Sequence, residues 1–254
     1  MDMKKASFAG SFYEADPVRL SNDIKSYLAQ AKKVVSKKPR AIIVPHAGYM
    51  YSGSVAAFGY KQLEGYMYNK IVIIGPSHRS VFNGMATIYA KAFETPLGNV
   101  PVFNNEGKHQ GIEVIPEAFS MEHNIEVQLP FLQSVLNGFK IFPILTGYID
   151  KNSEEFIKID NLLDDITLLV VSSDLSHYLP YEQCKSIDSK TLNLIETKSP
   201  QITQEQACGA AGLNILLKIA KKRNWMAKFL KYTNSGDITG DKFSVVGYTS
   251  FVFI

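Results

Sequence analysis

Short apolar runs along the chain alternate with segments in which apolar residues recur every three to four positions. Within each run nearly every residue is apolar, which is typical of strands in a sheet that is covered by helices on both faces. The intervening segments have the period of helices that bury one side. The pattern predicts strands at residues 41–44, 71–74, 141–145, 167–171 and 245–253.

Helix signals lie between these predicted strands. Asp16 followed by Pro17 is an N-cap with proline at the first helical position. Leu20, Ile24 and Leu28 then form one apolar stripe. Further helices are predicted at residues 52–63, 122–136, 153–163 and 181–197, and at 203–222, where Thr203 and Gln206 make a capping box.

The alternation of strand and helix predicts an α/β fold with a mostly parallel or mixed central sheet flanked by helices. The sequence contains no recognisable linker, internal repeat or low-complexity stretch. We therefore expect residues 1–254 to form a single domain. The turn-rich region 81–116 is expected to be a hairpin excursion with loops.

Composition excludes several classes of protein. The chain has 254 residues and a formal net charge of +3, too small an excess to predict a nucleic-acid-binding face. Its two cysteines are too few for a disulfide scaffold or a zinc ribbon, and they favour a reduced, cytoplasmic setting. The apolar runs reach about six residues, against roughly 20 for a membrane span, and the first residues lack the apolar core of a signal peptide.

Histidines follow three of the predicted strands directly. His46, His78 and His177 stand just past the strands at 41–44, 71–74 and 167–171, and His123 opens a predicted helix. Ligands of open α/β sheets bind beyond the carboxyl ends of the strands. Because neutral imidazole is both a common metal ligand and an acid–base group, the sequence predicts one shared site.

Each of these residues, taken alone, also fits a purely structural role. A single histidine in such a position is more often a loop residue or a hydrogen-bonded core residue. Cys208 stands in a stretch of small residues, which favours close helix packing. Residues 234–241, with two glycines and two aspartates, form either an ordinary turn or a loop that brings a carboxylate to the histidines.

Six ordered motifs between residues 9 and 237 carry a specific resemblance that covers nearly the whole chain. They are Ala9–Tyr13, Pro45–Tyr49, Gly75–His78, His123–Pro130, Ser172–His177 and Asn234–Asp237. Together they resemble the Memo family, whose bacterial and archaeal members are often called AmmeMemoRadiSam system protein B. The resemblance implies a fold related to the class III extradiol dioxygenases, in which two histidines and a carboxylate hold a non-haem Fe(II) and leave positions open for dioxygen and substrate.

The resemblance also implies a ligand set. His46, His78 and Asp237 would hold the divalent metal, which we expect to be Fe(II). Asp241 is a rival third ligand in the same C-terminal loop. Animal members carry a cysteine there as a proposed ligand, and an ungapped match places Ile238 at that position.

The remaining site residues are expected to act on the substrate. His177, oriented by Asp174, and His123, near Glu126, would take substrate-binding or proton-transfer roles. Asp174 could instead cap a helix that begins near Ser176. Glu126 is also a more remote candidate for the third metal ligand, since a helix would place it on the same face as His123.

The sequence leaves two functions open. The first is a metal-dependent, dioxygenase-like oxidoreductase that acts on a small or aromatic substrate. The alternative is a non-catalytic binding or adaptor protein that uses the same pocket for a peptide or protein partner. The resemblance further implies an association with radical SAM and AMMECR-type proteins. Stoichiometric iron with catechol turnover would separate the first function from the second.

Overall fold

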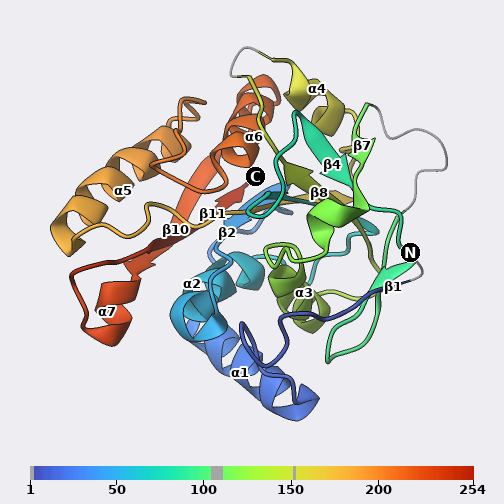
Figure 1. Cartoon of the computed structure of the whole chain (residues 1–254), viewed down its shortest axis with the longest axis horizontal. Coiled ribbons are helices and arrows are strands. Elements are labelled where there is room, and N and C mark those ends of the chain that lie inside the picture. The colour runs from blue at the N-terminus through green and yellow to red at the C-terminus, as the bar shows by residue number, and fades with distance from the viewer. Residues whose placement is uncertain (1–2, 104–110, 151–152) are drawn as a thin grey trace.

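The computed structural model describes residues 3–103, 111–150 and 153–254, and its centre is an eight-stranded mixed sheet (Figure 1). Strands β2, β9, β3 and β8 run parallel in the middle, whereas β11 and β4 pair antiparallel on either side of them. In spatial order the strands are β10 (Ala227–Asn234), β11 (Gly247–Phe253), β2 (Ala41–Val44), β9 (Thr167–Ser172), β3 (Lys70–Pro76), β8 (Lys140–Thr146), β4 (Met85–Thr87) and β7 (Glu113–Val114).

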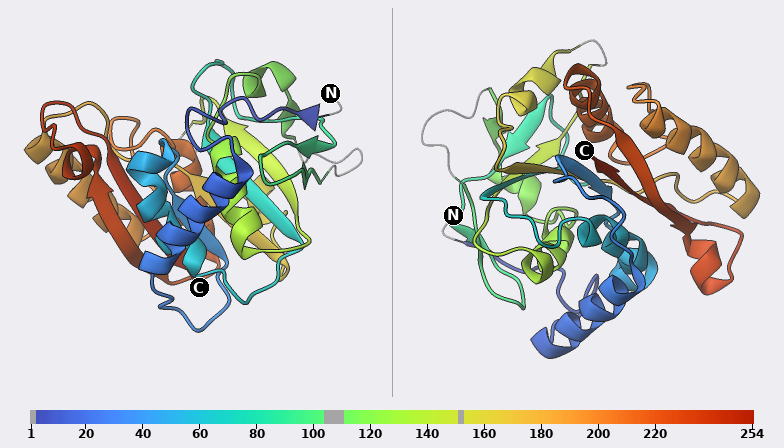
Figure 2. Two further views of the ribbon diagram at one scale, coloured as in Figure 1. Left: turned by 90° about the horizontal axis from the view of Figure 1, so that it is seen from below. Right: turned by 180° about the vertical axis from the view of Figure 1, so that it is seen from behind.

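Helices cover both faces of this sheet (Figures 1 and 2). Alternate residues of β2 belong to different cores, with Ile42 and Val44 in one cluster and Ala41 and Ile43 in the other. The first cluster lies under α1 (Pro17–Gln30), α2 (Tyr49–Lys61) and α3 (Leu129–Val135). The second lies under α4 (Glu155–Asp160), α5 (Tyr181–Glu196) and α6 (Ala210–Lys222). The predicted α/β fold with a covered mixed sheet is confirmed.

The turn-rich region beyond β3 contributes to a second, small sheet. Strands β5 (Ala92–Phe93) and β6 (Val100–Pro101) pair antiparallel, and β1 (Met3–Lys4) pairs with β5. The expected hairpin excursion is therefore present at β5–β6, while residues 104–110 lie outside the described residues.

Two predicted helices begin later than expected. The helix predicted at 122–136 reduces to α3, preceded by a turn and the 3₁₀ turn η2 (Glu126–Gln128). The helix predicted from Thr203 begins only at Ala210, although the backbone N–H of Thr203 does donate to the Gln206 side chain over 3.0 Å. In both places local side-chain bonds stabilise a turn instead of a first helical turn.

The C-terminal region contains a strand that the sequence did not predict. Strand β10 is the edge of the sheet and pairs with β11 alone, so it carries lysines and half-buried residues instead of an apolar run. It leads into a short helix, α7 (Ser235–Thr239), and Asn234 and Asp237 form a capping box at the N-terminus of this helix. The segment expected to be a turn or ligand loop is thus a capped helix.

The carboxyl ends of β2, β3 and β9 open at one edge of the sheet, and the residues that follow these strands meet there. Across the described residues, no helix combines the length and the apolar character that a membrane crossing requires.

Candidate functional site

A cleft of about 950 Å³ lies beyond these strand ends, and four histidines line it. His46 follows β2, His78 follows β3, His177 follows β9, and His123 comes from the turn before η2. The rings of His46, His78 and His123 form a compact group, with centroids 5.0–5.3 Å apart. The rings of His78 and His123 are stacked, at an interplanar angle of 14°.

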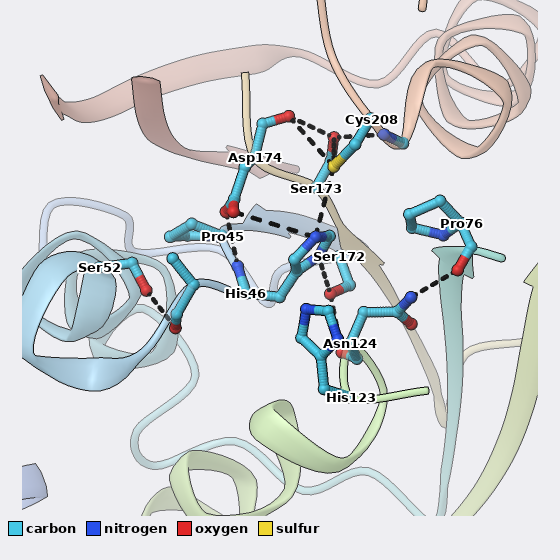
Figure 3. A network of polar contacts seen from close by, with 12 residues as sticks. Pro45, His46, Ser52, Pro76, His123, Asn124, Ser172, Ser173, Asp174 and Cys208 are labelled. Atoms are coloured by element: carbon cyan, nitrogen blue, oxygen red, sulfur yellow. Dashed lines mark hydrogen bonds and ion pairs between the residues drawn. The ribbon is translucent and has the colours of Figure 1, made fainter. Parts of the chain in front are cut away.

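His46 is almost fully buried, and both its backbone and its ring are held (Figure 3). Its backbone N–H donates to Asp174 Oδ1 over 2.8 Å, and its Nδ1 lies 2.9 Å from Ser172 Oγ. Its Nε2 lies 3.3 Å from the sulfur of Cys208. One ring nitrogen therefore faces the protein interior and the other faces the cleft.

Glu122 holds both the backbone and the ring of His78, as Asp174 and Ser172 do for His46. Its carboxylate accepts the backbone N–H of His78 over 2.7 Å and lies 2.9 Å from His78 Nδ1. The same oxygen that contacts His78 Nδ1 accepts the backbone N–H of His123 over 2.9 Å and lies 3.3 Å from His123 Nδ1. Glu122 is buried, and it is a site residue that sequence reasoning missed. Its position next to His123 was the available signal.

Burial keeps the rings of His46 and His123 neutral. The pKa of His46 falls to about 3 because burial disfavours the charged ring and a charged His78 would repel it. The pKa of His123 falls to about 4 for the same first reason, with His46 as its repelling neighbour. Burial, the largest single influence, would raise the pKa of Glu122, but the hydrogen bonds and charge of His78 together with the charge of His123 outweigh it, and the pKa is lowered. An anionic carboxylate thus lies beside the neutral ring of His123.

Cys208 is the second site residue that sequence reasoning missed. It lies just before α6, and Gly209 brings this loop against β9, since a Cβ at Gly209 would lie 2.6 Å from the Ser173 side chain. The expectation of close packing thus holds for Gly209, while Cys208 itself lines the cleft. Burial, followed by the nearby Asp174 carboxylate, raises the pKa of the Cys208 thiol. The sequence carried no signal for this site residue, because the predicted helix start at Thr203 placed Cys208 inside a helix.

Two groups of side chains in the described residues could hold a metal ion. In the first, His46, His78 and Cys208 each offer one ligand atom, and all three atoms lie within 4.8 Å of one another. The second group consists of His78, Glu122 and His123. Its contacts run through the Nδ1 atoms, which already face the Glu122 carboxylate.

Among the described residues, no hydrogen bond joins Asp174 to His177, although the charge of His177 acts on Asp174 and lowers its pKa against the effect of burial. The Nδ1 of His177 lies 2.8 Å from the Leu175 carbonyl oxygen, to which it donates. Asp174 instead fixes the backbone of His46, and burial raises its pKa. Nor does Asp174 cap a helix, because residues 173–180 form a loop. This loop is fixed from α5, where Asp188 Oδ1 accepts the backbone N–H of Ser176 over 3.0 Å.

Glu126 points away from the histidines and holds the N-terminal segment. Its carboxylate accepts the backbone N–H groups of Ser7 and Phe8 and the hydroxyl of Tyr13, at 2.7–3.0 Å. The ammonium of Lys4 lies 3.8 Å away. This placement argues against the catalytic role and against the ligand role expected for Glu126.

Asp237 does not lie among the residues that line the histidine cleft. Its carboxylate caps α7 and accepts the hydroxyls of Tyr181 over 2.6 Å and Thr233 over 3.0 Å. Asp241 binds the backbone N–H of Phe243, as expected for a residue that ends a turn. The geometry therefore argues against either aspartate, and against position 238 on the same helix, as a source of the third ligand.

Comparisons with known proteins agree with the resemblance seen in the motifs. The family described as "Memo-like protein" matches residues 4–252. A MEMO1 family protein of Thermoplasma volcanium is 34% identical over 98% of both chains, and one of Methanosarcina mazei is 34% identical over 99% of both. A third, from Aquifex aeolicus, is 32% identical over the full length of both chains. This protein therefore belongs to the Memo family.

Proposed function

We propose that the cleft binds a divalent metal ion through His46 Nε2, His78 Nε2 and Cys208 Sγ. The observation that carries the proposal is the convergence of these three side chains, whose ligand atoms lie within 4.8 Å of one another at the wall of an open cleft. Three protein ligands with an open side match the general form of a catalytic metal site. The thiol takes the place that the sequence suggested for Asp237.

The chemistry of the donors fits such an ion. The Nδ1 atoms of His46 and His78 face Ser172 and Glu122, so the Nε2 atoms remain for the metal. A ligating imidazole whose other nitrogen is held by the protein is the usual arrangement around bound metals. The thiol must lose its proton to ligate, so metal binding is expected to release a proton from Cys208.

We propose Fe(II) as the resident ion, in keeping with the dioxygenase-like fold. Imidazole and thiolate also accept zinc and copper, so direct metal analysis must decide the identity. When bound, Fe(II) would supply open coordination positions and redox chemistry with dioxygen. The reduced, cytoplasmic setting expected from the sequence suits this proposal, because both cysteines are free thiols.

We propose a dioxygenase-like oxidoreductase that acts on a small or aromatic substrate. The Nδ1–H of His177 donates to the Leu175 carbonyl, which leaves its Nε2 able to accept a substrate proton. The ring of Phe12 lies 4.4 Å from the ring of His123, and both line the cleft. Their side of the cleft offers aromatic contact for a substrate ring, while His123, neutral because of its lowered pKa, can accept a hydrogen bond.

A binding function without turnover is the second candidate, and the surroundings of the cleft favour it. Tyr178, which lines the cleft, is 76% exposed. Met50, which precedes the cleft residue Tyr51 in the sequence, is 71% exposed. Such side chains would contribute to a partner surface if they belong to one contiguous apolar patch around the cleft. A peptide, or the radical SAM and AMMECR-type proteins implied by the resemblance, would be the partners to test.

The test is metal analysis of the whole chain, purified without oxygen and reconstituted with Fe(II) or Co(II). We expect about one ion per chain and, with Co(II), a thiolate-to-metal charge-transfer band. Cys208→Ser should abolish the band and weaken binding. Cys184→Ser is a matched control, because Cys184 is a buried thiol that bonds to Asp188 on α5. Asp237→Asn should bind metal like the parent.

Each outcome has a defined meaning. Loss of metal in Asp237→Asn but not in Cys208→Ser would overturn the ligand set. Absence of stoichiometric metal from every preparation, together with tight binding of a peptide or partner protein, would replace the oxidoreductase proposal by the binding function. Oxygen consumption with catechol substrates by the Fe(II)-loaded protein would support the enzyme.

A further inference from the structure

The hydroxyl group of Ser172, at the end of β9, lies at the centre of three buried polar contacts, and Figure 3 shows two of the partner residues, His46 and Asn124. Its Oγ lies 2.8 Å from the Asn124 carbonyl oxygen, 2.8 Å from Gln128 Nε2 and 2.9 Å from His46 Nδ1. All four residues are at most 2% exposed, so bulk water does not replace any of these bonds. The direction of each bond can therefore be worked out by counting protons.

The amide of Gln128 has one orientation that satisfies its neighbours. The hydroxyl of Tyr60 donates to Gln128 Oε1 over 2.7 Å, and Gln128 Nε2 donates to the Pro45 carbonyl oxygen over 3.0 Å. Turning the amide around would place its oxygen against the Pro45 carbonyl, and two acceptors cannot bond to each other. The NH₂ group of Gln128 therefore also faces Ser172, and it donates to that hydroxyl.

The proton count at Ser172 then leaves one solution for His46. A hydroxyl has one proton to donate and can accept two hydrogen bonds. The carbonyl of Asn124 can only accept, so it takes the Ser172 proton, and Gln128 fills one accepting position. The remaining contact, to His46 Nδ1, forms a hydrogen bond only if that nitrogen carries the proton.

We propose that Ser172 and Gln128 are positioning residues that hold His46 in the tautomer protonated on Nδ1. The Nε2 of His46 is then unprotonated and faces Cys208 and the cleft. The tautomer follows from these bonds in the metal-free protein, so the inference does not require the proposed metal. If the metal binds, the nitrogen that ligates it is prepared in advance.

The arrangement acts against a competing attraction. His46 Nε2 lies 3.9 Å from Asp174 Oδ2, and a carboxylate at this distance favours a proton on Nε2. His78 has no such conflict, because its carboxylate, Glu122, contacts Nδ1 directly. We therefore expect the Ser172 and Gln128 bonds to decide the tautomer of His46, and we expect the Nε2–H form to appear when they are removed.

The test is long-range ¹H–¹⁵N correlation spectroscopy of the metal-free full chain labelled with ¹⁵N-histidine, with the His46 signals assigned by a His46→Gln variant. We expect a protonated Nδ1 and an unprotonated Nε2 in the parent. Ser172→Ala should shift His46 to the Nε2–H form, and Ser172→Thr should restore the parent tautomer. Gln128→Met should weaken the preference for the Nδ1–H form, because the Ser172 hydroxyl loses the donor that helps to fix its orientation toward the Asn124 carbonyl.

Ser52→Ala is the matched control, since the Ser52 hydroxyl is buried and donates to the Ala47 carbonyl without contacting His46. It should leave the tautomer unchanged. Co(II) affinity should fall about tenfold in Ser172→Ala and stay near the parent value in Ser52→Ala. The affinity loss is a second readout and does not replace the tautomer.

An Nε2–H form of His46 in the parent protein would overturn the inference, and this measurement needs no variant to fold. A Ser172→Ala variant that keeps the Nδ1–H form would also overturn it, and an unchanged Gln128→Met would remove Gln128 from the assignment. A protein that shows the expected tautomer but binds no metal contradicts the proposed function and leaves this inference in place.

Discussion

Glu122 and Glu126 are both buried and lie four residues apart, yet they serve opposite sides of the same segment. Glu122 binds the backbone and ring of His78 and the backbone of His123, at the wall of the cleft. Glu126 binds the N-terminal segment through Ser7, Phe8 and Tyr13. One carboxylate supports the candidate metal site, and the other fastens the chain that passes beside it.

The backbone explains the difference. In an α-helix, residues four apart lie on one face, so a helix over 122–136 would have directed both carboxylates to the same side. The chain instead makes a turn at 122–125 and the 3₁₀ turn η2 before α3 begins. In a continuous helix, both carboxylates would have faced the same neighbours, and one of the two contacts could not have formed.

Among single substitutions, the largest expected effect is on stability, from Glu126→Gln. The Lys4 side chain is 5% exposed and the Glu126 side chain 1%, so removal of the carboxylate charge leaves a buried ammonium group without its ion pair. Breaking one side of a buried pair costs about 3 kcal/mol. We expect the free energy of unfolding in urea to fall by about that amount. An unfolding free energy equal to that of the parent would contradict the anchoring role.

The same variant also tests the separation of the two roles. Glu126→Gln should bind Co(II) as tightly as the parent, measured under conditions in which both proteins are folded. A loss of affinity as large as that in a Glu122 variant would show that the two carboxylates are coupled.

The next effect is on metal binding, from Glu122→Gln. The amide can still accept from the backbone of His78, but it no longer supplies the negative charge beside the two rings. Loss of a carboxylate that supports a ligating histidine lowers metal affinity by about 10- to 100-fold. A Co(II) competition titration measures this. Unchanged affinity would mean that the Glu122 charge does not contribute to the site.

Much of the fold could be predicted because its signals are local. The strands in the middle of the sheet are apolar on both faces, and α1 carries its own N-cap at Asp16, whose Oδ1 accepts two backbone N–H groups. Strand β10 could not be found in this way, because an edge strand with lysines has no apolar run. Its place depends on pairing with β11, which is a long-range contact.

The candidate site shows the same division. The four histidines were identified because strand ends meet at one edge of a parallel sheet. Cys208 was not, because its approach depends on the packing of Gly209 against Ser173, which is remote in sequence. Asp237 was chosen by its neighbourhood in the sequence, and the capping box of α7 then used its carboxylate locally. A carboxylate that is already used in a local hydrogen bond, as in Asp237, is not free to ligate a metal ion in the cleft.

A pH-dependent effect should distinguish the cleft from the N-terminal segment. The pKa values of His46, about 3, and His123, about 4, lie below the ordinary histidine value, so both rings are neutral in the folded metal-free protein. Below pH 6.5 the unfolded chain binds protons that the folded chain does not. Stability should therefore be greatest above pH 6.5 and fall toward pH 4, by about 1.4 kcal/mol per pH unit for each proton.

The variant His123→Gln tests the origin of this slope. It removes one of the two titrating rings, so the acid slope of the unfolding free energy should become shallower by about one proton. Urea unfolding at several pH values between 4 and 6.5 provides the measurement. An unchanged slope would mean that His123 is protonated in the folded state.

The smallest expected effect comes from Tyr13→Phe, which removes a single hydrogen bond from the Glu126 side. The Tyr13 hydroxyl donates to Glu126 Oε1 over 2.7 Å, and its ring packs 5.6 Å from that of Tyr49. Phenylalanine keeps the ring contact, and Glu126 keeps the backbone donors of Ser7 and Phe8. We therefore expect a loss of about 1 kcal/mol in unfolding free energy, since one bond among several is lost without a buried charge being stranded. Combined with Glu126→Gln, the loss should be less than the sum of the two, because the amide already weakens the hydrogen bond that Tyr13→Phe removes. Full additivity would mean that the hydroxyl and the carboxylate act independently, which would contradict the role of Glu126 as the common anchor of this segment.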